Sequence, residues 1–173
     1  MVEPWLSGTL TDVPAIPRQI LHALELAAED IELWCASLSD SEMELRPFGT
    51  APVGFHLRHI ARSLDRLLTY VEGEQLSPAQ LSSLSSELVA PPDKEAVLTE
   101  VQEAIASATN RVRQIRPDSF EEQRYVGRKR LPTTVGGLLV HCAEHTQRHV
   151  GQAVTTAKVV VGLRADDVPT RGA

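Results

Sequence analysis

The sequence predicts an all-α protein, a single domain built as a four-helix bundle. Four long segments place apolar residues at steps of three and four, the spacing that puts side chains on one face of a helix. No segment shows the alternation of apolar and polar residues that is typical of a half-buried strand. A chain of 173 residues suits one domain, and four long amphipathic helices are typical of a bundle.

The first two predicted helices cover residues 14–38 and 52–72. Asp12 followed by Pro14 resembles a helix start, because proline is tolerated where the backbone N–H has no partner. Gly73 follows the second segment and can end it. The apolar stripe of the first helix consists of Ile16, Ile20, Leu24, Ala27, Ile31, Trp34 and Leu38. The stripe of the second consists of Val53, Leu57, Ile60, Leu64, Leu67, Leu68 and Val71.

A serine-rich connection, residues 74–92, separates the second helix from the third. It contains Pro78, Pro91 and Pro92, and we interpret it as a loop with one short helix. This link is roughly 20 residues long, which is enough to run along the bundle. We therefore expect a long crossover between the second and third helices, and a topology that is not simply up-down-up-down.

Residues 94–116 form the third predicted helix, with a clear start and a clear end. Asp93 is a good N-cap, and acidic residues early in the segment with arginines late complement the helix dipole. Pro117 ends the helix. The predicted buried stripe consists of Val97, Val101, Ile105, Ala108, Val112 and Ile115.

The remaining chain is predicted as an irregular segment over residues 118–132, followed by a fourth helix over residues 133–161. The run RKR at 128–130 is the only basic cluster, and it indicates a solvated loop because no aromatic residues interleave with it. We expect the domain to cover residues 1–162 and residues 163–173 to be a flexible C-terminal tail.

Composition and charge exclude several classes of protein. The formal net charge of −6 excludes a generally basic nucleic-acid binder, and two cysteines are too few for a secreted disulfide scaffold. The N-terminal residues do not resemble a signal peptide, and no apolar run is long enough to predict a transmembrane helix. We expect a cytoplasmic protein without nucleic-acid or membrane partners.

Three of the six histidines fall within the fourth predicted helix, at positions 141, 145 and 149. Histidines four residues apart lie on one helix face, where two imidazoles can converge on one metal ion. His141 and His149 are about 12 Å apart along the axis, which is too far to share an ion easily. The stripe of Val135, Leu138, Cys142, His145 and His149 is predicted to face the core, which favours the pair His145 and His149.

The second predicted helix offers a third ligand, either His56 or His59. Periodicity places His56 nearer the apolar stripe and His59 further round the helix, so it slightly favours His56. His22 is expected on the flank of the first helix, and Cys142 is expected to be a core residue, with a thiolate ligand as the alternative. The competing interpretation is that these histidines bind no metal and have ordinary hydrogen-bond partners.

The chain resembles the DinB-like family of metalloenzymes, also called DinB/YfiT-like, over about residues 14–161. The resemblance lies in two motifs, PVGFHLRHIARSLDRLL in the second helix and HCAEHTQRHVGQ in the fourth. The family pattern has one histidine in the second helix and an HxxxH pair shortly before Gly-Gln in the last. It matches HTQRH at 145–149 followed by Gly151 and Gln152, and it implies His59, His145 and His149 as metal ligands, with His59 preferred to His56.

The resemblance also implies a function. Relatives use a divalent metal ion, zinc or nickel among others, to activate a low-molecular-weight thiol. This implies a metal-dependent S-transferase or hydrolase acting on a small-molecule substrate, and a homodimer. Three neutral imidazoles leave at least one metal position open, as a catalytic site requires. By position, the side chains that could orient the ligands are Glu144, Arg148, Gln152, Arg62 and Tyr70.

Two other functions are compatible with the same histidines. The first is a non-catalytic bundle that binds metal or a small ligand, such as a stress-response protein. The second is a purely structural bundle. Metal content and turnover distinguish these functions from the enzyme.

Overall fold

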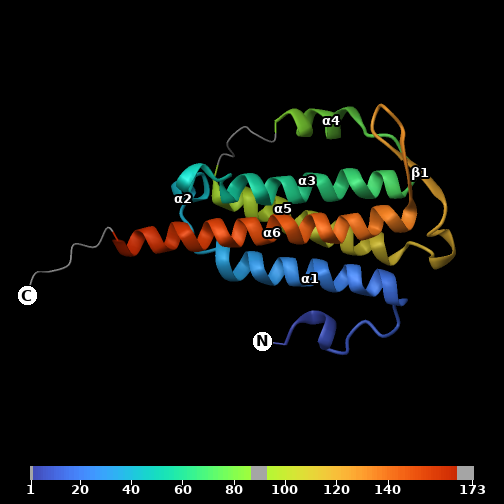
Figure 1. Cartoon of the computed structure of the whole chain (residues 1–173), viewed down its shortest axis with the longest axis horizontal. Coiled ribbons are helices and arrows are strands. Elements are labelled where there is room, and N and C mark those ends of the chain that lie inside the picture. Colours follow the sequence, from blue (N-terminus) through green and yellow to red (C-terminus); the bar gives the residue numbers. More distant parts are fainter. Residues whose placement is uncertain (1, 87–92, 167–173) are drawn as a thin grey trace, which may run out of the picture.

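A computed structural model describes residues 2–86 and 93–166 and confirms the all-α four-helix bundle. Its long helices are α1 (Ala15–Cys35), α3 (Val53–Val71), α5 (Lys94–Arg113) and α6 (Val135–Asp166). Two shorter helices, α2 (Asp40–Met43) and α4 (Pro78–Ser85), lie in the connections (Figure 1). Single 3-10 turns cover Pro4–Leu6, Pro47–Gly49 and Pro117–Ser119. Within the described ranges, every helix is too short or too polar to span a bilayer.

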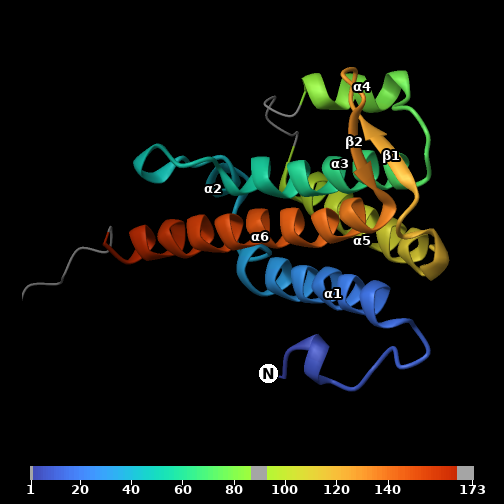
Figure 2. The same ribbon diagram turned by 45° about the vertical axis from the view of Figure 1, so that its right-hand side comes forward.

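The four long helices do not simply alternate in direction along the chain. Helices α1 and α6 run in one direction, and α3 and α5 run in the opposite direction (Figures 1 and 2). Helix α6 packs between α1 and α3, and α5 packs against both α3 and α1, so the consecutive helices α1 and α3 lie on a diagonal. Because α3 and α5 are parallel, the link between them must return along the bundle, and the predicted crossover is confirmed.

The ends of the helices follow the expected local chemistry. The Asp93 carboxylate accepts a hydrogen bond from the backbone N–H of Ala96 and caps α5, whose last turn carries Arg111 and Arg113. Helix α3 ends before Gly73, whose φ of +84° lies in the left-handed region that glycine adopts without strain. In the crossover, Ser77 and Gln80 form a capping box at the start of α4.

The expectation of an irregular segment over 118–132 was wrong. Strands β1 (Gln123–Val126) and β2 (Leu131–Thr134) form an antiparallel hairpin, in which Gln123 pairs with Thr134. Neither strand, QRYV or LPTT, alternates apolar with polar residues, so periodicity did not reveal them. Residues 127–130 form the exposed turn, so the run RKR does lie in a solvated loop. Arg124 Nε donates to the carbonyl of Val71 at 2.8 Å and ties the hairpin to the end of α3.

Two other boundaries differ from the sequence prediction. Helix α1 ends at Cys35 rather than at residue 38. Leu38, in the connection that follows the helix, is nonetheless fully buried, whereas Ile16 is 48% exposed. Helix α6 continues to Asp166, past the point where we expected the tail to begin, and residues 167–173 lie outside the described residues. Helix α4 is the single short helix expected in the crossover, and residues 87–92 are not described.

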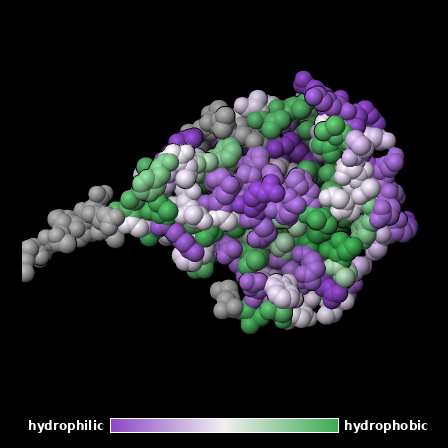
Figure 3. Space-filling model, viewed as in Figure 1, coloured by the Kyte–Doolittle hydropathy of each residue, from purple (hydrophilic) through white to green (hydrophobic). Residues whose placement is uncertain are grey.

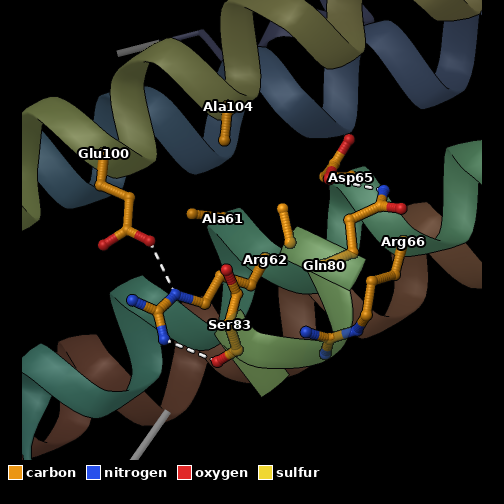
Figure 4. A pocket seen from close by; sticks show the side chains of 9 residues that line it. Ala61, Arg62, Asp65, Arg66, Gln80, Ser83, Glu100 and Ala104 are labelled. Atoms are coloured by element: carbon orange, nitrogen blue, oxygen red, sulfur yellow. Dashed lines mark hydrogen bonds and ion pairs between the residues drawn. The ribbon is translucent and has the colours of Figure 1, made fainter. Parts of the chain in front are cut away.

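Ion pairs and hydrogen bonds hold the crossover against the bundle. Arg62, on α3, donates through Nε to Glu100 of α5 at 2.7 Å and through Nη1 to the Ser83 carbonyl of α4 at 2.9 Å (Figure 4). These side chains line a cavity of about 260 Å³ between the three helices. Arg62, a predicted orienting residue for a metal ligand, is therefore engaged with α4 and α5.

Candidate metal centre

The antiparallel packing of α3 against α6 brings together a trio of histidines, His59, His145 and His149. His59 lies on α3, and His145 and His149 lie one turn apart on α6. The Nε2 atoms of His59 and His145 are 3.0 Å apart. The ring of His149 is centred 4.4 Å from that of His59 and 4.6 Å from that of His145. The family motif, which selected His59 with His145 and His149, therefore selected residues that are adjacent in space.

The spacing of the three ring nitrogens is suitable for a metal ion. One nitrogen from each ring lies within 4.8 Å of the other two, and all three side chains are half-buried. Two nitrogens bound to one ion at about 2.0–2.1 Å can be no more than ~4.2 Å apart, so small rotations of the rings suffice. Among the described residues, this is the group of histidine, cysteine and acidic side chains that converges closely enough to bind an ion.

The helical wheel placed His145 and His149 incorrectly. The inward stripe of α6 carries Cys142, Thr146 and Val150, which are fully buried, whereas the two histidines lie on the flank that faces α3. The three histidines therefore lie where α3 and α6 pack together. Figure 3 shows hydrophilic side chains gathered over the middle of these two helices.

Cys142 is a core residue, as expected. Burial raises the pKa of its thiol to about 12, so the thiol stays protonated at neutral pH and is a poor metal ligand. Cys142 does not belong to the histidine group. Cys35 is likewise buried, with its pKa raised to about 12 by burial.

His56 is more deeply buried than His59, as periodicity predicted, yet it does not belong to the group. Its side chain is 5% exposed, and its Nδ1 lies 3.0 Å from Nδ1 of His149. Phe55 stacks on the ring of His59, with centroids 5.6 Å apart and planes 16° apart. The two histidines of α3 therefore differ in position: His59 joins the trio, and His56 contacts one member of the trio.

The other predicted residues lie around the trio or away from it. His141 is 45% exposed, and its ring is centred 5.3 Å from that of His145. Glu144 pairs with Arg148 at 2.7 Å. Tyr70 is buried. His22 is also buried, so it is not the flank residue that we expected, and its Nδ1 lies 3.4 Å from a carboxylate oxygen of Glu25 in the same helix.

A cavity of about 530 Å³ lies beside His56, the residue that contacts His149. Sequence reasoning did not find this cavity, because its walls come from two segments, residues 50–56 and 148–156, that are distant along the chain. Its lining includes Thr50, His56, Arg148, Gly151, Gln152 and Thr155. Gly151 lies inside α6, and a methyl group added there would meet no atom within 4 Å. Glycine inside a helix costs about 1 kcal/mol relative to alanine, and neither backbone geometry nor packing requires it here.

Burial of two imidazoles makes the stability of the metal-free protein depend on pH. Burial, with smaller contributions from neighbouring histidines, lowers the pKa of His56 and of His145 from 6.5 to about 4. Between these values the unfolded chain binds protons that the folded chain does not, so the free energy of unfolding falls as the pH falls. We expect a loss of about 2 kcal/mol between neutral pH and pH ~4.5, after discounting His145 for its exposure.

Urea unfolding in the presence of a chelator measures this effect. The His56→Asn, His145→Asn double variant, which lacks both titrating rings, should lose much less stability over the same interval. An equal pH dependence in the parent and the double variant would contradict this cause.

Comparison with known proteins gives a family and a fold. The model of the DinB superfamily matches residues 23–153 of the chain. Comparison with curated protein sequences gives no match. The crystal structure of a conserved protein from Enterococcus faecalis is similar, with 20% identity, a TM-score of 0.69, and coverage of 87% of this chain and 99% of that one.

A second solved structure has the same kind of topology. YfiT from Bacillus subtilis, described as a probable metal-dependent hydrolase with an unusual four-helix bundle topology, is 17% identical, with a TM-score of 0.61. The match covers 84% of this chain and 87% of YfiT. At these identities the likeness shows the fold.

Proposed function

We propose that this chain, which belongs to the DinB superfamily, is a metal-dependent enzyme that acts on a small molecule. Its ligands would be His59, His145 and His149, and its reaction a thiol-dependent S-transfer or a hydrolysis. The observation that supports the proposal best is the convergence of three ring nitrogens from two helices within 4.8 Å. Zinc and nickel are the proposed ions, since both accept imidazole ligands.

The donor set favours a catalytic site over a closed structural site. Three imidazoles leave at least one position for a substrate atom or water. A bound divalent ion would supply Lewis acidity there, lowering the pKa of a coordinated thiol or water. The trio would hold the reacting group where α3 and α6 pack together. The half-buried position of the trio would limit the water around that group.

We propose that the substrate attacked by the metal-bound thiol or water binds in the cavity beside His56. This cavity would accept a small molecule, and its lining offers threonine hydroxyls, the Gln152 amide and the Arg148 guanidinium as polar contacts. Gly151 borders this space two residues after His149, so a larger side chain there would enter the volume that we assign to substrate.

Turnover by metal-loaded protein tests the function. The parent, reconstituted with zinc or nickel, is incubated with glutathione or cysteine and an aryl halide, and separately with a p-nitrophenyl ester. We expect metal-dependent product in one assay, which chelation or His59→Ala should remove. Metal-loaded parent that gives no product in either assay would overturn the enzymatic proposal and favour the non-catalytic metal-binding bundle.

Substitutions at Gly151 test the position of the substrate. Gly151→Ala should keep activity and raise the free energy of unfolding by about 1 kcal/mol, because the added methyl group meets open space. Gly151→Leu should keep the metal yet raise KM or remove activity, since its side chain extends into the cavity. Full activity with unchanged KM in Gly151→Leu would contradict a substrate in this cavity.

A further inference from the structure

His56 has a contact that neither the core nor the candidate metal group accounts for. Its buried ring lies between His149 and the cavity of about 530 Å³, and the His56 and His149 rings are centred 5.3 Å apart and tilted by 44°. The Nδ1 atoms of the two rings are 3.0 Å apart, the distance of a hydrogen bond. A buried polar ring in such a place is normally there because it is hydrogen-bonded.

The direction of this hydrogen bond follows from the chemistry of imidazole. Of two facing ring nitrogens, one must carry the hydrogen and the other must offer a lone pair. With Nδ1 of His149 engaged by His56, Nε2 is the nitrogen of His149 that would bind an ion. A neutral imidazole bound through Nε2 carries its hydrogen on Nδ1 and must donate it. His56 would then accept at Nδ1 and carry its own hydrogen on Nε2.

We propose that His56 is a positioning residue, a neutral imidazole that accepts a hydrogen bond from His149 and thereby fixes the tautomer and ring orientation of that ligand. The inference rests on the proposed metal site. Metal-bound histidines almost always donate their second N–H to a carboxylate, a carbonyl or water. A neutral imidazole as the acceptor adds no negative charge, so the ion would keep more of its Lewis acidity.

Two variants of His56 separate hydrogen bonding from packing. His56→Asn places an amide oxygen near the position of Nδ1 and keeps the acceptor, whereas His56→Leu keeps the apolar bulk and removes the acceptor. Competition with a chromophoric chelator measures the zinc affinity of each metal-free protein. We expect His56→Leu to weaken zinc binding about 10–100-fold and His56→Asn to stay within about threefold of the parent.

The visible spectrum of cobalt(II)-loaded protein is a second readout that a purely structural role would not change. The absorption bands should shift in His56→Leu and be restored in His56→Asn. Unchanged affinity and spectrum in His56→Leu would overturn the proposal. Loss of all binding in both variants, as in His59→Ala, would overturn it too, because His56 would then be a ligand.

Nitrogen-15 spectra of the histidine rings in the zinc-loaded parent require no substitution, so they remain decisive if His56→Leu does not fold. We expect Nδ1 of His149 to carry a slowly exchanging hydrogen and Nδ1 of His56 to carry none. A hydrogen on Nδ1 of His56 would overturn the proposal. If the parent binds no zinc at all, the metal site itself fails, and this outcome is distinct from every result above.

Discussion

Replacing both His145 and His149 with alanine is expected to remove metal from the protein. The two substitutions delete two of the three imidazoles that converge within 4.8 Å and leave His59 alone on α3. A single histidine on a helix binds divalent ions weakly. Untagged parent, purified without chelators, should therefore contain close to one ion per chain, and the double variant should contain almost none.

Elemental analysis of the two proteins measures this difference, and His141→Ala is the matched control. His141 lies one turn before His145 on the same helix but is 45% exposed and outside the group, so its loss should leave metal content unchanged. Negligible metal in both parent and double variant, even after reconstitution, would reject the site. Equal loss in His141→Ala would place the site elsewhere on α6.

Thermal unfolding tests the same metal site, because a bound ion raises the stability of the folded chain. An ion that binds only the folded chain stabilises it, by about 2.7 kcal/mol when the free ion is at 100 times its dissociation constant. Added metal should raise the melting temperature of the parent and of His141→Ala. It should leave the double variant unchanged.

Replacing Leu64 with alanine is expected to cause a large loss of stability. Leu64 is 1% exposed and belongs to the core stripe of α3. Truncating a fully buried leucine removes its burial free energy and leaves a cavity, at a cost of about 2–5 kcal/mol. Since a domain is stable by only about 5–15 kcal/mol, the variant should be visibly destabilised.

Chemical denaturation of metal-free protein measures this loss, and Leu33→Ala is its control. Leu33 is the same residue type in α1 but is 59% exposed, so its replacement should change the free energy of unfolding by less than about 0.5 kcal/mol. Equal, small effects in both variants would show that Leu64 does not pack in the core as described.

Sequence patterns predicted the bundle well because each long helix carries its own signals. Apolar residues at helical spacing identified the four helices, and Asp93, Gly73 and Pro117 marked their ends within a few residues. The hairpin was missed, since neither of its strands alternates apolar with polar residues. Its stability depends on tertiary contacts, such as that of Arg124 with the end of α3, which no local pattern contains.

The candidate site could be predicted only in part. The spacing of His145 and His149 on one helix face is a local property, and so the sequence showed it. Their position on the flank of α6 depends on which helices α6 packs between, and a helical wheel does not contain that information. Periodicity correctly made His56 the more buried of the two histidines of α3, yet burial does not identify the one that joins the group, since each ring lies 3.0 Å from a histidine of α6. The family motif selected His59, and its role as a metal ligand stays a prediction.

The trio joins two helices that are adjacent in the bundle but distant along the chain. His59 and His145 are 86 residues apart, and the segment between them contains the crossover, α5 and the hairpin. An ion bound by both would therefore act as a cross-link that closes a long loop. Cross-links of this kind stabilise proteins chiefly by restricting the unfolded chain. Metal should thus slow the separation of α6 from α3 more than it slows local opening of α1, whose residues lie outside the closed loop.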